Sequence, residues 1–485
     1  MRLAGLATAA GLTVHAGATA MVTGFAIDHR KVAPGNVFGA FQGTAVNGED
    51  FVPAAVAAGA IAVVARPELS VEGALLIADA RPRRAFARLA AQFFAPFPET
   101  IVAVTGTNGK TSTIEMTRQL WRMAGQRAAS IGTLGVTTAD ESVSTGLTTP
   151  DIVTFLANLS GLAREGITHV AYEASSHGLA QFRNEGPRVI AGGFTNLSRD
   201  HLDYHSGMDD YFAAKMRLFD EVVTDGGTAV IWADDAWSAK AIDHARDRGL
   251  TLFTVGTAGE ALRLVSREPT KLGQALVLEH AGQQRKVALP LIGAYQSANA
   301  MVAAGLVLAS GGNPAPTFDA MARLQPVRGR LERAAIAKSG APIYVDYAHT
   351  PDALTAAIAA LRPHAKGRVI VVFGAGGDRD AGKRPEMGRA AANDAELAIV
   401  TDDNPRGEDP AEIRAQVRAG AATSANIREI AGRREAIAAA IAEAGADDIV
   451  LVAGKGHEQG QIVGRGAEAR VLPFDDVAVA RECAT

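Results

Sequence analysis

Three series of short apolar runs, separated by turn residues and helical patterns, divide the chain. The first series, in residues 22–65, consists of VTGFAID, NVFGAF and AIAVVA, with a helical pattern in DFVPAAVAAGA before the last run. This pattern predicts a small α/β domain that ends near residue 97. Residues 93–100, FFAPFPET, contain two prolines and are typical of a linker.

The second and third series have the strand–turn–helix order of parallel sheets. Their apolar runs are residues 101–105, 169–175, 189–197 and 228–233, then 342–348, 368–377, 397–403 and 448–456. We expect an α/β protein of three domains, at residues 1–97, 98–326 and 327–485. The central sheet is expected to be doubly wound and mainly parallel. Ligands bind beyond the carboxyl ends of strands in such sheets, so functional residues are sought there. The Ala-rich residues 433–446 predict an amphipathic packing helix.

Composition removes several classes of protein. The 485 residues carry a net charge of −4, and 48% are hydrophobic, so a large core is available and a general nucleic-acid binder is disfavoured. The single cysteine, Cys483, excludes a disulfide framework and a cysteine-based zinc site. No apolar run reaches the roughly 18 residues of a membrane span. The N-terminus has parts of a signal peptide, but Gly5 and Gly11 interrupt its apolar stretch and Arg2 is its lone charge, so we expect a cytoplasmic protein.

The clearest motif is VTGTNGKTS, residues 104–112, between an apolar strand and a helical stretch. The common phosphate loop G-x-x-x-x-G-K-[ST] needs a glycine six residues before its lysine, but that position is Val104, and Gly106 comes four before Lys110. The motif still predicts a phosphate loop, with backbone amides and Lys110 facing phosphates and Thr111 facing Mg²⁺. The alternative is a Gly-rich turn capped by threonine. The loop residues are Gly106, Thr107, Asn108, Gly109, Lys110, Thr111 and Ser112.

Two further groups of polar residues follow strands of the second series. Glu173 ends one strand and could bind Mg²⁺ beside the loop, while Ser175, Gln181 and Arg183 follow it. The alternative for these is a helix N-cap and a solvated arginine. After the next strand, His201 and His205 are four apart and could share a helix face, in a segment rich in aspartate. Lys215 follows on an expected helix, where a surface lysine is the alternative.

The strand ends of the third series carry four more polar turns. They contain Asp346 with Tyr347 and His349, then Arg379, then Asn404-Pro405-Arg406, then Gly454 with Glu458. Each alone could be an ordinary loop. Because they end strands of one domain, together they predict a composite site.

These motifs together resemble the Mur ligases, ATP-dependent amide-forming enzymes of peptidoglycan synthesis. The segments that match in order are T-G-T-N-G-K-T-S, E-A-S-S-H-G-L, T-N-L-S-R-D-H-L-D-Y-H, Y-F-A-A-K, L-I-G-A-Y-Q-S-A-N, G-R-L-E, D-Y-A-H-T-P-D and A-G-K-G-H-E. The resemblance spans about residues 22 to 465. It implies a small N-terminal α/β domain for the UDP end of a substrate, a central ATP-binding domain and a C-terminal Rossmann-like α/β domain for an amino acid.

D-N-P-R, residues 403–406, resembles the signature of the type that adds meso-2,6-diaminopimelate to UDP-N-acetylmuramoyl-L-alanyl-D-glutamate. Diaminopimelate differs from lysine by a second α-amino acid centre with a carboxylate, which Arg406 can hold through two parallel hydrogen bonds. Three alternatives remain: a lysine-adding sibling, a folylpolyglutamate synthetase-like ligase, and a nucleotide-binding regulator that has lost catalysis. Arg406 argues against the first and D-N-P-R against the second. Intact Lys110, Glu173, His201 and Lys215 argue against the third.

The resemblance also implies roles for single residues. For catalysis these are Lys110, Glu173, His201 and Lys215, and the metal ligands are Thr111, Glu173, His201 and Lys215 as a carbamate. For the nucleotide they are the loop residues with Asn299, Arg330, Asp346, Tyr347 and His349. For the UDP-muramoyl dipeptide they are Asp28, His29, Arg30, Thr148, Thr149, Ser175, Gln181 and Arg183. For diaminopimelate they are Arg379, Asp403, Asn404, Pro405, Arg406, Gly454 and Glu458. The implied cofactors are ATP, two Mg²⁺ ions and a CO₂-derived carbamate on Lys215, in a protein that we expect to be monomeric, without a nucleic-acid or membrane partner.

Three positions depart from the family pattern. The uridine-binding segment usually reads D-S-R, but here it is Asp28-His29-Arg30, so an imidazole stands in place of the serine hydroxyl. Leu147 stands where asparagine is frequent, and residues 43–50 diverge. All three concern contacts to the UDP-sugar rather than catalysis.

Overall fold

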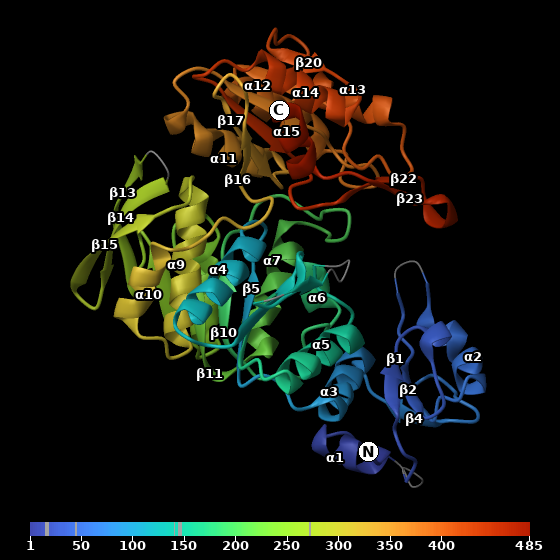
Figure 1. The fold of residues 1–485 in the computed structure, drawn as a ribbon. Coiled ribbons are helices and arrows are strands. Elements are labelled where there is room, and N and C mark those ends of the chain that lie inside the picture. Colours follow the sequence, from blue (N-terminus) through green and yellow to red (C-terminus); the bar gives the residue numbers. More distant parts are fainter. Residues whose placement is uncertain (15–18, 44–45, 140, 144–147, 271–272) are drawn as a thin grey trace.

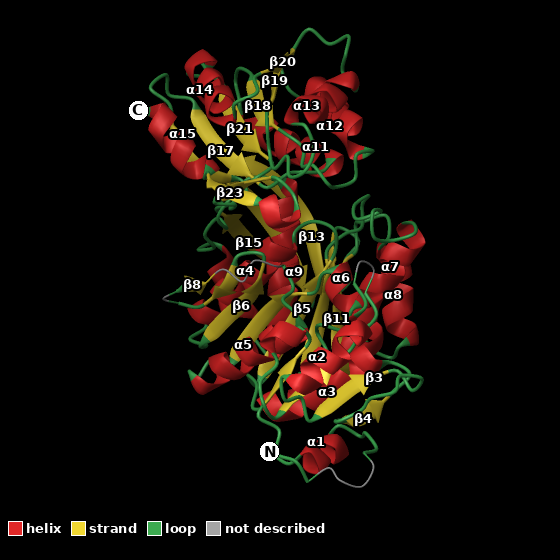
Figure 2. Cartoon of the chain, turned by 90° about the vertical axis from the view of Figure 1, so that its right-hand side faces the viewer, coloured by secondary structure: helices red, strands yellow, loops and turns green. Residues whose placement is uncertain are grey.

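A computed structural model describes residues 1–14, 19–43, 46–139, 141–143, 148–270 and 273–485. The chain forms three main sheets that follow one another in sequence, and helices cover both faces of the larger two (Figures 1 and 2). In Figure 1 the C-terminal sheet and its helices lie above the central sheet, and the N-terminal sheet lies beside it. This confirms the predicted α/β class. The domain limits at residues 97/98 and 326/327 stay a prediction.

The N-terminal sheet is wholly parallel, in the order β1-β2-β3-β4. Its strands are β1 (Gly24–Ala26), β2 (Asn36–Gly39), β3 (Ala62–Ala65) and β4 (Leu75–Ala78), and its helices are α1 (Leu3–Ala9), α2 (Val52–Ala57) and α3 (Pro82–Phe94), with short 3₁₀ turns at His29–Lys31 and Gly48–Phe51. The apolar runs of the first series are therefore strands, and DFVPAAVAAGA contains α2, as predicted. The predicted linker starts too early, because Phe93 and Phe94 form the end of α3 and pack against the core.

The central sheet has eleven strands in the order β15-β14-β13-β12-β11-β10-β5-β9-β6-β7-β8. The strands are β5 (Thr100–Thr105), β6 (Ala128–Gly132), β7 (Gly135–Thr137), β8 (Ser142–Val143), β9 (His169–Glu173), β10 (Val189–Phe194), β11 (Val223–Trp232), β12 (Thr251–Gly256), β13 (Leu262–Thr270), β14 (Gly273–His280) and β15 (Gln283–Leu289). The helices are α4 (Lys110–Met123), α5 (Ile152–Arg164), α6 (Ser176–Ala180), α7 (Met208–Arg217), α8 (Ser238–Asp247), α9 (Ala294–Ala309) and α10 (Pro314–Met321), with a π turn at Leu218–Val222.

Two separate cores show that this sheet is doubly wound. One face packs on α4, α9 and α10 through residues such as Ile114, Val302 and Phe318, and the other packs on α5 through residues such as Phe155 and Leu159. The four predicted strands all pair in parallel. The apolar pattern did not predict the further parallel strands β12, β13 and β6, nor the antiparallel pairs that β14, β15, β7 and β8 add at the two edges.

The C-terminal sheet has the order β16-β17-β21-β18-β19-β20, and β16 is its one antiparallel strand. Its strands are β16 (Glu332–Ile336), β17 (Pro342–Asp346), β18 (Val369–Phe373), β19 (Leu397–Val400), β20 (Ile427–Glu429) and β21 (Ile449–Ala453), and a separate hairpin pairs β22 (Gly460–Val463) with β23 (Arg470–Pro473). The helices are α11 (Pro351–Leu361), α12 (Lys383–Asp394), α13 (Pro410–Ala419), α14 (Arg433–Glu443) and α15 (Asp476–Ala484), with 3₁₀ turns at Arg362–His364 and Gly466–Glu468. The predicted strands and the packing helix in 433–446 are confirmed.

Parallel pairing brings the strand ends that carry polar motifs to one edge of each sheet. In the central sheet, β5 and β9 end at Thr105 and Glu173, and in the C-terminal sheet β17 and β21 end at Asp346 and Ala453. Among the residues that the structure describes, no helix is long and apolar enough to cross a bilayer.

Candidate active site

The loop between β5 and α4 needs both of its glycines. Gly106 and Gly109 have φ of 144° and 86°, which disfavours any residue with a side chain. A Cβ on Gly106 would lie 2.0 Å from Thr195 Oγ1, and one on Gly109 would lie 2.2 Å from Asn299 Oδ1. The backbone can therefore pass closely beside both neighbours and leave the amides at the start of α4 open to an anion.

Two lysines meet at this loop. The Nζ of Lys110 donates to the carbonyl oxygens of Gly106 and Thr107 at 3.0 and 2.8 Å. Lys215 lies on α7 with its side chain 1% exposed, and its Nζ donates to the Gly106 oxygen at 2.7 Å. Burial and the neighbouring Lys110 cation lower the pKa of Lys215 well below its ordinary value, although Asp200 opposes them. Lys215 is thus not a surface lysine.

Glu173 lies beside the loop at the end of β9. Its Oε1 accepts from Thr111 Oγ1 at 2.9 Å and from the amide of Thr133 at 2.7 Å, and a Cβ on Gly132 would lie 2.3 Å from the same oxygen. Arg330, from the C-terminal part of the chain, donates to Thr111 Oγ1 at 3.0 Å. A carboxylate and a hydroxyl oxygen therefore stand together next to the phosphate loop, which is a donor set suited to a hard cation such as Mg²⁺.

His201 lies in a turn rather than on a helix. His205 donates its amide to the His201 carbonyl, yet α7 begins only at Met208, so the expectation that the two histidines share a helix face is wrong. Both rings instead pack around His177, at centroid distances of 5.0 and 5.7 Å. Burial and the nearby lysines lower the pKa of His201 to about 3, although Asp200 opposes them. Outside the gaps given above, no three His, Cys, Asp or Glu side chains form a ready metal cluster.

A cavity of about 300 Å³ opens in front of the loop, between the central and C-terminal sheets. Of the residues expected at a nucleotide, it is lined by Asn108, Gly109, Ser112, Asn299, Arg330, Asp346, Tyr347 and His349. The polar residues that sequence reasoning missed are Asn196, Ser198, Asp235, Tyr295 and Asp352.

Arg330 is held over the Tyr347 ring, 4.3 Å from its centroid. Burial raises the pKa of the neighbouring Asp346, although Arg330 opposes it, and its carboxylate accepts from the amides of Leu331 and Ala348 at 2.6 and 2.8 Å. Contacts within the C-terminal part of the chain therefore hold Arg330, Asp346 and Tyr347 in place along this side of the cavity.

The five central residues expected at the muramoyl dipeptide lie together. Thr149 Oγ1 contacts Ser175 Oγ at 2.9 Å, and Arg183 donates to the Thr149 carbonyl at 2.9 Å and to Gln181 Oε1 at 2.7 Å. Thr148 Oγ1 accepts from Thr133 at 3.2 Å. Ser175 also caps α6 by accepting from Gly178, so the helix-cap interpretation holds as well. Arg183 is half-buried rather than solvated.

The N-terminal residues expected at uridine make local contacts. Asp28 accepts from the backbone amide of Arg30 at 3.0 Å and from its guanidinium at 2.8 Å, while the His29 ring stacks on Phe51 with centroids 4.3 Å apart. His29 therefore offers a flat aromatic surface where the family pattern has a hydroxyl. Leu147 and residues 44–45 lie outside the described residues.

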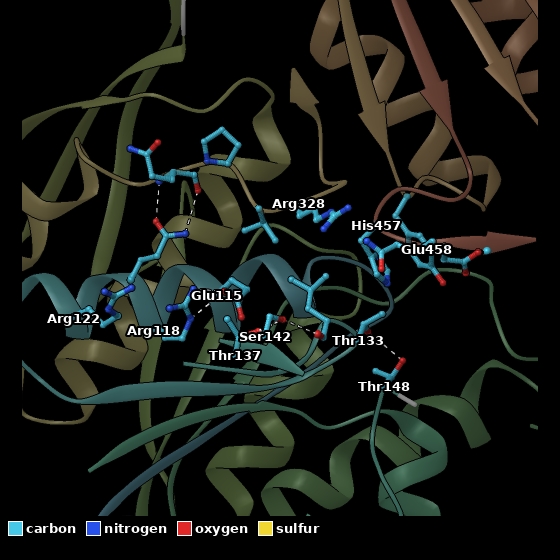
Figure 3. A pocket seen from close by; sticks show the side chains of 18 of the residues that line it. Glu115, Arg118, Arg122, Thr133, Thr137, Ser142, Thr148, Arg328, His457 and Glu458 are labelled. Carbon is cyan, nitrogen blue, oxygen red and sulfur yellow. Dashed lines mark hydrogen bonds and ion pairs between the residues drawn. The ribbon is translucent and has the colours of Figure 1, made fainter. Parts of the chain in front are cut away.

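A second cavity, of about 1280 Å³, lies between the central sheet and the C-terminal loops, and Figure 3 shows Thr148 facing it from one side and Glu458 from the other. Arg379, Arg406 and Glu458, three of the expected diaminopimelate residues, line it, and so does Tyr347. Arg406 has φ of 49° and its Nη1 donates to the Gly377 carbonyl at 2.9 Å. Burial and the adjacent Arg379 cation lower the pKa of Arg406, which marks the pair as a place for an anion.

The other four expected residues, Asp403, Asn404, Pro405 and Gly454, are not among those that line the cavity. Asn404 donates through Nδ2 to Glu458 Oε2 at 2.8 Å, so it supports the lining from behind. A Cβ on Gly454 would lie 2.5 Å from Asp403 Oδ2. Sequence reasoning did not single out Lys455 or His457, although both lie within A-G-K-G-H-E. It also did not single out Arg118 and Arg328, which line the cavity from other parts of the chain.

Family models match three parts of the chain. These are the Mur ligase family catalytic domain over residues 21–94, the Mur ligase middle domain over 104–307 and the Mur ligase glutamate ligase domain over 329–456. A UDP-N-acetylmuramoyl-L-alanyl-D-glutamate–2,6-diaminopimelate ligase of Zymomonas mobilis is 61% identical over 95% of this chain and 94% of its own length. The protein of the same name from Bradyrhizobium diazoefficiens is 52% identical over 94% of this chain and 93% of its own.

Solved structures agree with this assignment. A structure of a UDP-N-acetylmuramoyl-L-alanyl-D-glutamate–2,6-diaminopimelate ligase superposes with a TM-score of 0.71 at 33% identity, over 99% of this chain and 98% of that one. A folylpolyglutamate synthase of Mycobacterium tuberculosis reaches a TM-score of 0.63 at 18% identity over 77% of this chain and 92% of its own, which shows a shared fold alone. Matches along nearly the whole length therefore assign the chain to the Mur ligase family.

Proposed function

We propose that this chain is an ATP-dependent, ADP-forming ligase that adds meso-2,6-diaminopimelate to UDP-N-acetylmuramoyl-L-alanyl-D-glutamate in peptidoglycan synthesis. The observation that carries the proposal is the wall of the large cavity, where two arginines, Arg379 and Arg406, stand with one carboxylate, Glu458. The high identity to relatives named for this reaction supports it.

The free end of diaminopimelate carries a carboxylate and an ammonium on one carbon. Arg406 can bind the carboxylate through parallel hydrogen bonds, and Glu458 can accept from the ammonium. Lysine has the ammonium alone, so its binding would leave a half-buried guanidinium without an anion. We therefore favour diaminopimelate over lysine as the substrate.

The reaction that we propose has two steps. The γ-carboxylate of the D-glutamyl residue attacks the γ-phosphate of ATP and forms an acyl phosphate while ADP leaves. The amine of diaminopimelate then attacks the acyl carbon, and phosphate leaves. Lys110 and the amides at the start of α4 offset the negative charge that gathers between carboxylate and phosphate. The hydroxyls of Thr149 and Ser175 and the guanidinium of Arg183 would hold the dipeptide close to Lys110 and the α4 amides.

Thr111, Glu173 and His201 are proposed to hold Mg²⁺, together with a carbamate on Lys215. When bound, Mg²⁺ supplies positive charge to the phosphate oxygens of ATP. The adjacent oxygens of Thr111 and Glu173 fit a hard cation, and an uncharged Lys215 amine fits reaction with CO₂. We further propose that the protein is a cytoplasmic monomer with domains at residues 1–97, 98–326 and 327–485.

A turnover assay tests the proposed function. The full chain is supplied with ATP, Mg²⁺ and the UDP-muramoyl dipeptide, and with either meso-diaminopimelate or L-lysine, while phosphate release and the amide product are measured. We expect product with diaminopimelate and little with lysine. Equal use of lysine would overturn the role of Arg406, and folded protein that turns over neither amino acid would favour a regulatory role.

A further inference from the structure

Lys455 is a buried cation directly behind the wall of the large cavity. It follows the end of β21 and stands between Gly454 and Gly456, whose φ values are 115° and 55°. These two glycines let the chain reverse, and the lysine side chain turns inward with 0% of it exposed. A lysine is almost never fully buried unless it is paired, so its partners reveal its role.

The partners form a closed triangle. Lys455 Nζ donates to Asn404 Oδ1 at 2.9 Å and to Glu458 Oε2 at 2.9 Å, and Asn404 Nδ2 donates to the same Glu458 oxygen at 2.8 Å. Asn404 Oδ1 also accepts from the amide of Ile462 at 2.9 Å. Two donors therefore fix which end of the Asn404 amide is oxygen, and this turns its NH₂ towards Glu458.

This triangle leaves Glu458 in one orientation. Its Oε2 is taken by Lys455 and Asn404 behind the wall, while the residue itself lines the cavity. Oε1 is then the oxygen free to accept from a ligand in front. Without Lys455 the carboxylate would lose its charge-assisted partner and its fixed direction.

Lys455 also sets the charge of the wall. Near this wall the cations Arg379, Arg406 and Lys455 stand with the carboxylates Glu458 and Asp403, the latter 4.0 Å from Lys455 Nζ. The buried Arg433 also acts on both carboxylates, but it has its own ion pair with Asp476. A ligand end that is a zwitterion adds no net charge to this set. A ligand end that is a lone ammonium adds a positive charge without bringing an anion, which a low-dielectric site that already holds several cations disfavours.

We propose that Lys455 is a positioning and specificity-determining residue that orients Glu458 and makes the cavity select an amino acid with a zwitterionic far end over one with a lone ammonium. This proposal rests on the proposed function, because it concerns the same cavity. Lys455 does not touch the substrate and acts through Asn404 and Glu458.

The test compares Lys455→Met, Glu458→Gln and the double variant in the full-length enzyme, with ATP, the UDP-muramoyl dipeptide and either meso-diaminopimelate or L-lysine. For Lys455→Met we expect the KM for diaminopimelate to rise at least about tenfold, as for loss of a charge-assisted hydrogen bond, with the KM for ATP within about twofold of wild type. The ratio of kcat/KM for diaminopimelate over lysine should fall at least about tenfold. Lys366→Met, an exposed lysine at the opposite end of the same sheet, is the matched control.

The double variant decides between positioning and mere stabilisation. If Lys455 acts through Glu458, the double variant should be no worse for diaminopimelate than Glu458→Gln alone, since the two losses are not additive. Additive losses, or an equal rise in the KM of all three substrates, would overturn the proposal. Should Lys455→Met fail to fold, the comparison of Glu458→Gln with the double variant still decides, because the double variant also lacks the Glu458 carboxylate that makes the 2.9 Å ion pair with Lys455. Wild-type enzyme that turns over neither amino acid would instead overturn the proposed function.

Discussion

Lys110 and Lys215 donate to one and the same oxygen, the carbonyl of Gly106, at 3.0 and 2.7 Å. Two ammonium groups this close repel each other in a buried site. Burial and Lys110 lower the pKa of Lys215, so the neutral amine of Lys215 is favoured, and a neutral amine is the form that reacts with CO₂. A carbamate there would place an anion opposite Lys110 in place of a second cation.

Replacement of Lys215 by alanine should abolish ligase turnover, with a fall in kcat of about 100-fold or more, because the negative group beside the phosphate loop is lost. Short carboxylates such as formate or acetate should restore part of the activity. Phosphate release measured across a carboxylate titration checks this. Lys240→Ala, on α8 with its side chain 62% exposed, is the control and should behave as wild type. A fully active Lys215→Ala enzyme would rule out the carbamate.

Replacement of Arg330 by alanine should raise the KM for ATP about tenfold or more. Its guanidinium donates to Thr111 Oγ1 and lies over the Tyr347 ring. The alanine variant loses both contacts, so Thr111 and Tyr347 are held less firmly on the two sides of the smaller cavity. Steady-state kinetics with ATP varied and both other substrates saturating measure this. Arg333→Ala, an exposed arginine on β16, should leave the KM for ATP unchanged. An unchanged KM for ATP in Arg330→Ala would place the nucleotide elsewhere.

Replacement of Arg406 by lysine should raise the KM for diaminopimelate about tenfold, since a lysine ammonium cannot give two parallel hydrogen bonds to a carboxylate. Arg406→Ala should raise the KM for diaminopimelate further and should reduce the selectivity for diaminopimelate over lysine. Competition between the two amino acids, read from the amide products by mass spectrometry, gives the preference directly. Arg418→Ala, on the exposed side of α13, serves as the control. Unchanged preference in both Arg406 variants would contradict the carboxylate clamp.

Arg433 and Asp476 form a fully buried ion pair between α14 and α15, with contacts of 2.8 and 2.6 Å. Asp476→Ala leaves the guanidinium buried without its partner, which should cost about 3–5 kcal/mol of unfolding free energy. Urea unfolding followed by circular dichroism measures the loss. Arg434→Ala removes an exposed pair with Glu482 on the same two helices and should leave the urea midpoint unchanged. A midpoint in Asp476→Ala equal to wild type would show that the buried pair is dispensable.

Burial and the nearby Arg330, Arg328 and Lys455 cations lower the pKa of His457 to about 3 from its ordinary value of 6.5. The imidazole therefore stays neutral in the folded protein while the unfolded chain takes up a proton below about pH 6.5. The stability contributed by the neutral ring is fully present above pH 6.5 and is lost as the pH falls towards 3. Melting temperatures between pH 7.5 and 5 should fall less steeply for His457→Gln than for wild type. If melting temperature falls equally with pH in wild type and in His457→Gln, the His457 ring takes up protons in the folded protein as readily as in the unfolded chain.

Apolar runs were sufficient to predict β5, β9, β10 and β11 of the central sheet and the position of the phosphate loop, because a buried parallel strand reads as a continuous apolar stretch. The parallel strands β6 and β12 of the same sheet were not predicted. The edge strands β13 to β15 were not predicted, since most of β13 is exposed and its sequence, LRLVSREPT, mixes charged with apolar residues. The same limit applied to His201 and His205, whose four-residue spacing suggested a helix although the segment turns around His177 instead.

A recognised motif did not by itself reveal which of its side chains line a cavity. Asp235 lines the smaller cavity from a segment in which no motif was recognised, and Tyr295 lines it from within L-I-G-A-Y-Q-S-A-N, where only Asn299 was expected at the nucleotide. Lys455 was within a recognised motif, yet its role depends on the inward turn between two glycines, which sequence spacing does not reveal. Asp403 and Asn404 were expected to contact diaminopimelate, but neither lines the large cavity, and Asn404 instead hydrogen-bonds to Glu458.

Tyr347 lines both cavities, with Arg330 over its ring and His457 at a centroid distance of 5.0 Å. Because Tyr347 is part of both walls, a ligand in one cavity that displaces its ring also changes the shape of the other cavity. The binding free energies of the two ligands therefore depend on each other. Such coupling is reciprocal: if a bound nucleotide strengthens the hold on the amino acid by some factor, the amino acid strengthens the hold on the nucleotide by the same factor. A compound that filled either space alone would thus change in potency with the concentration of the other ligand.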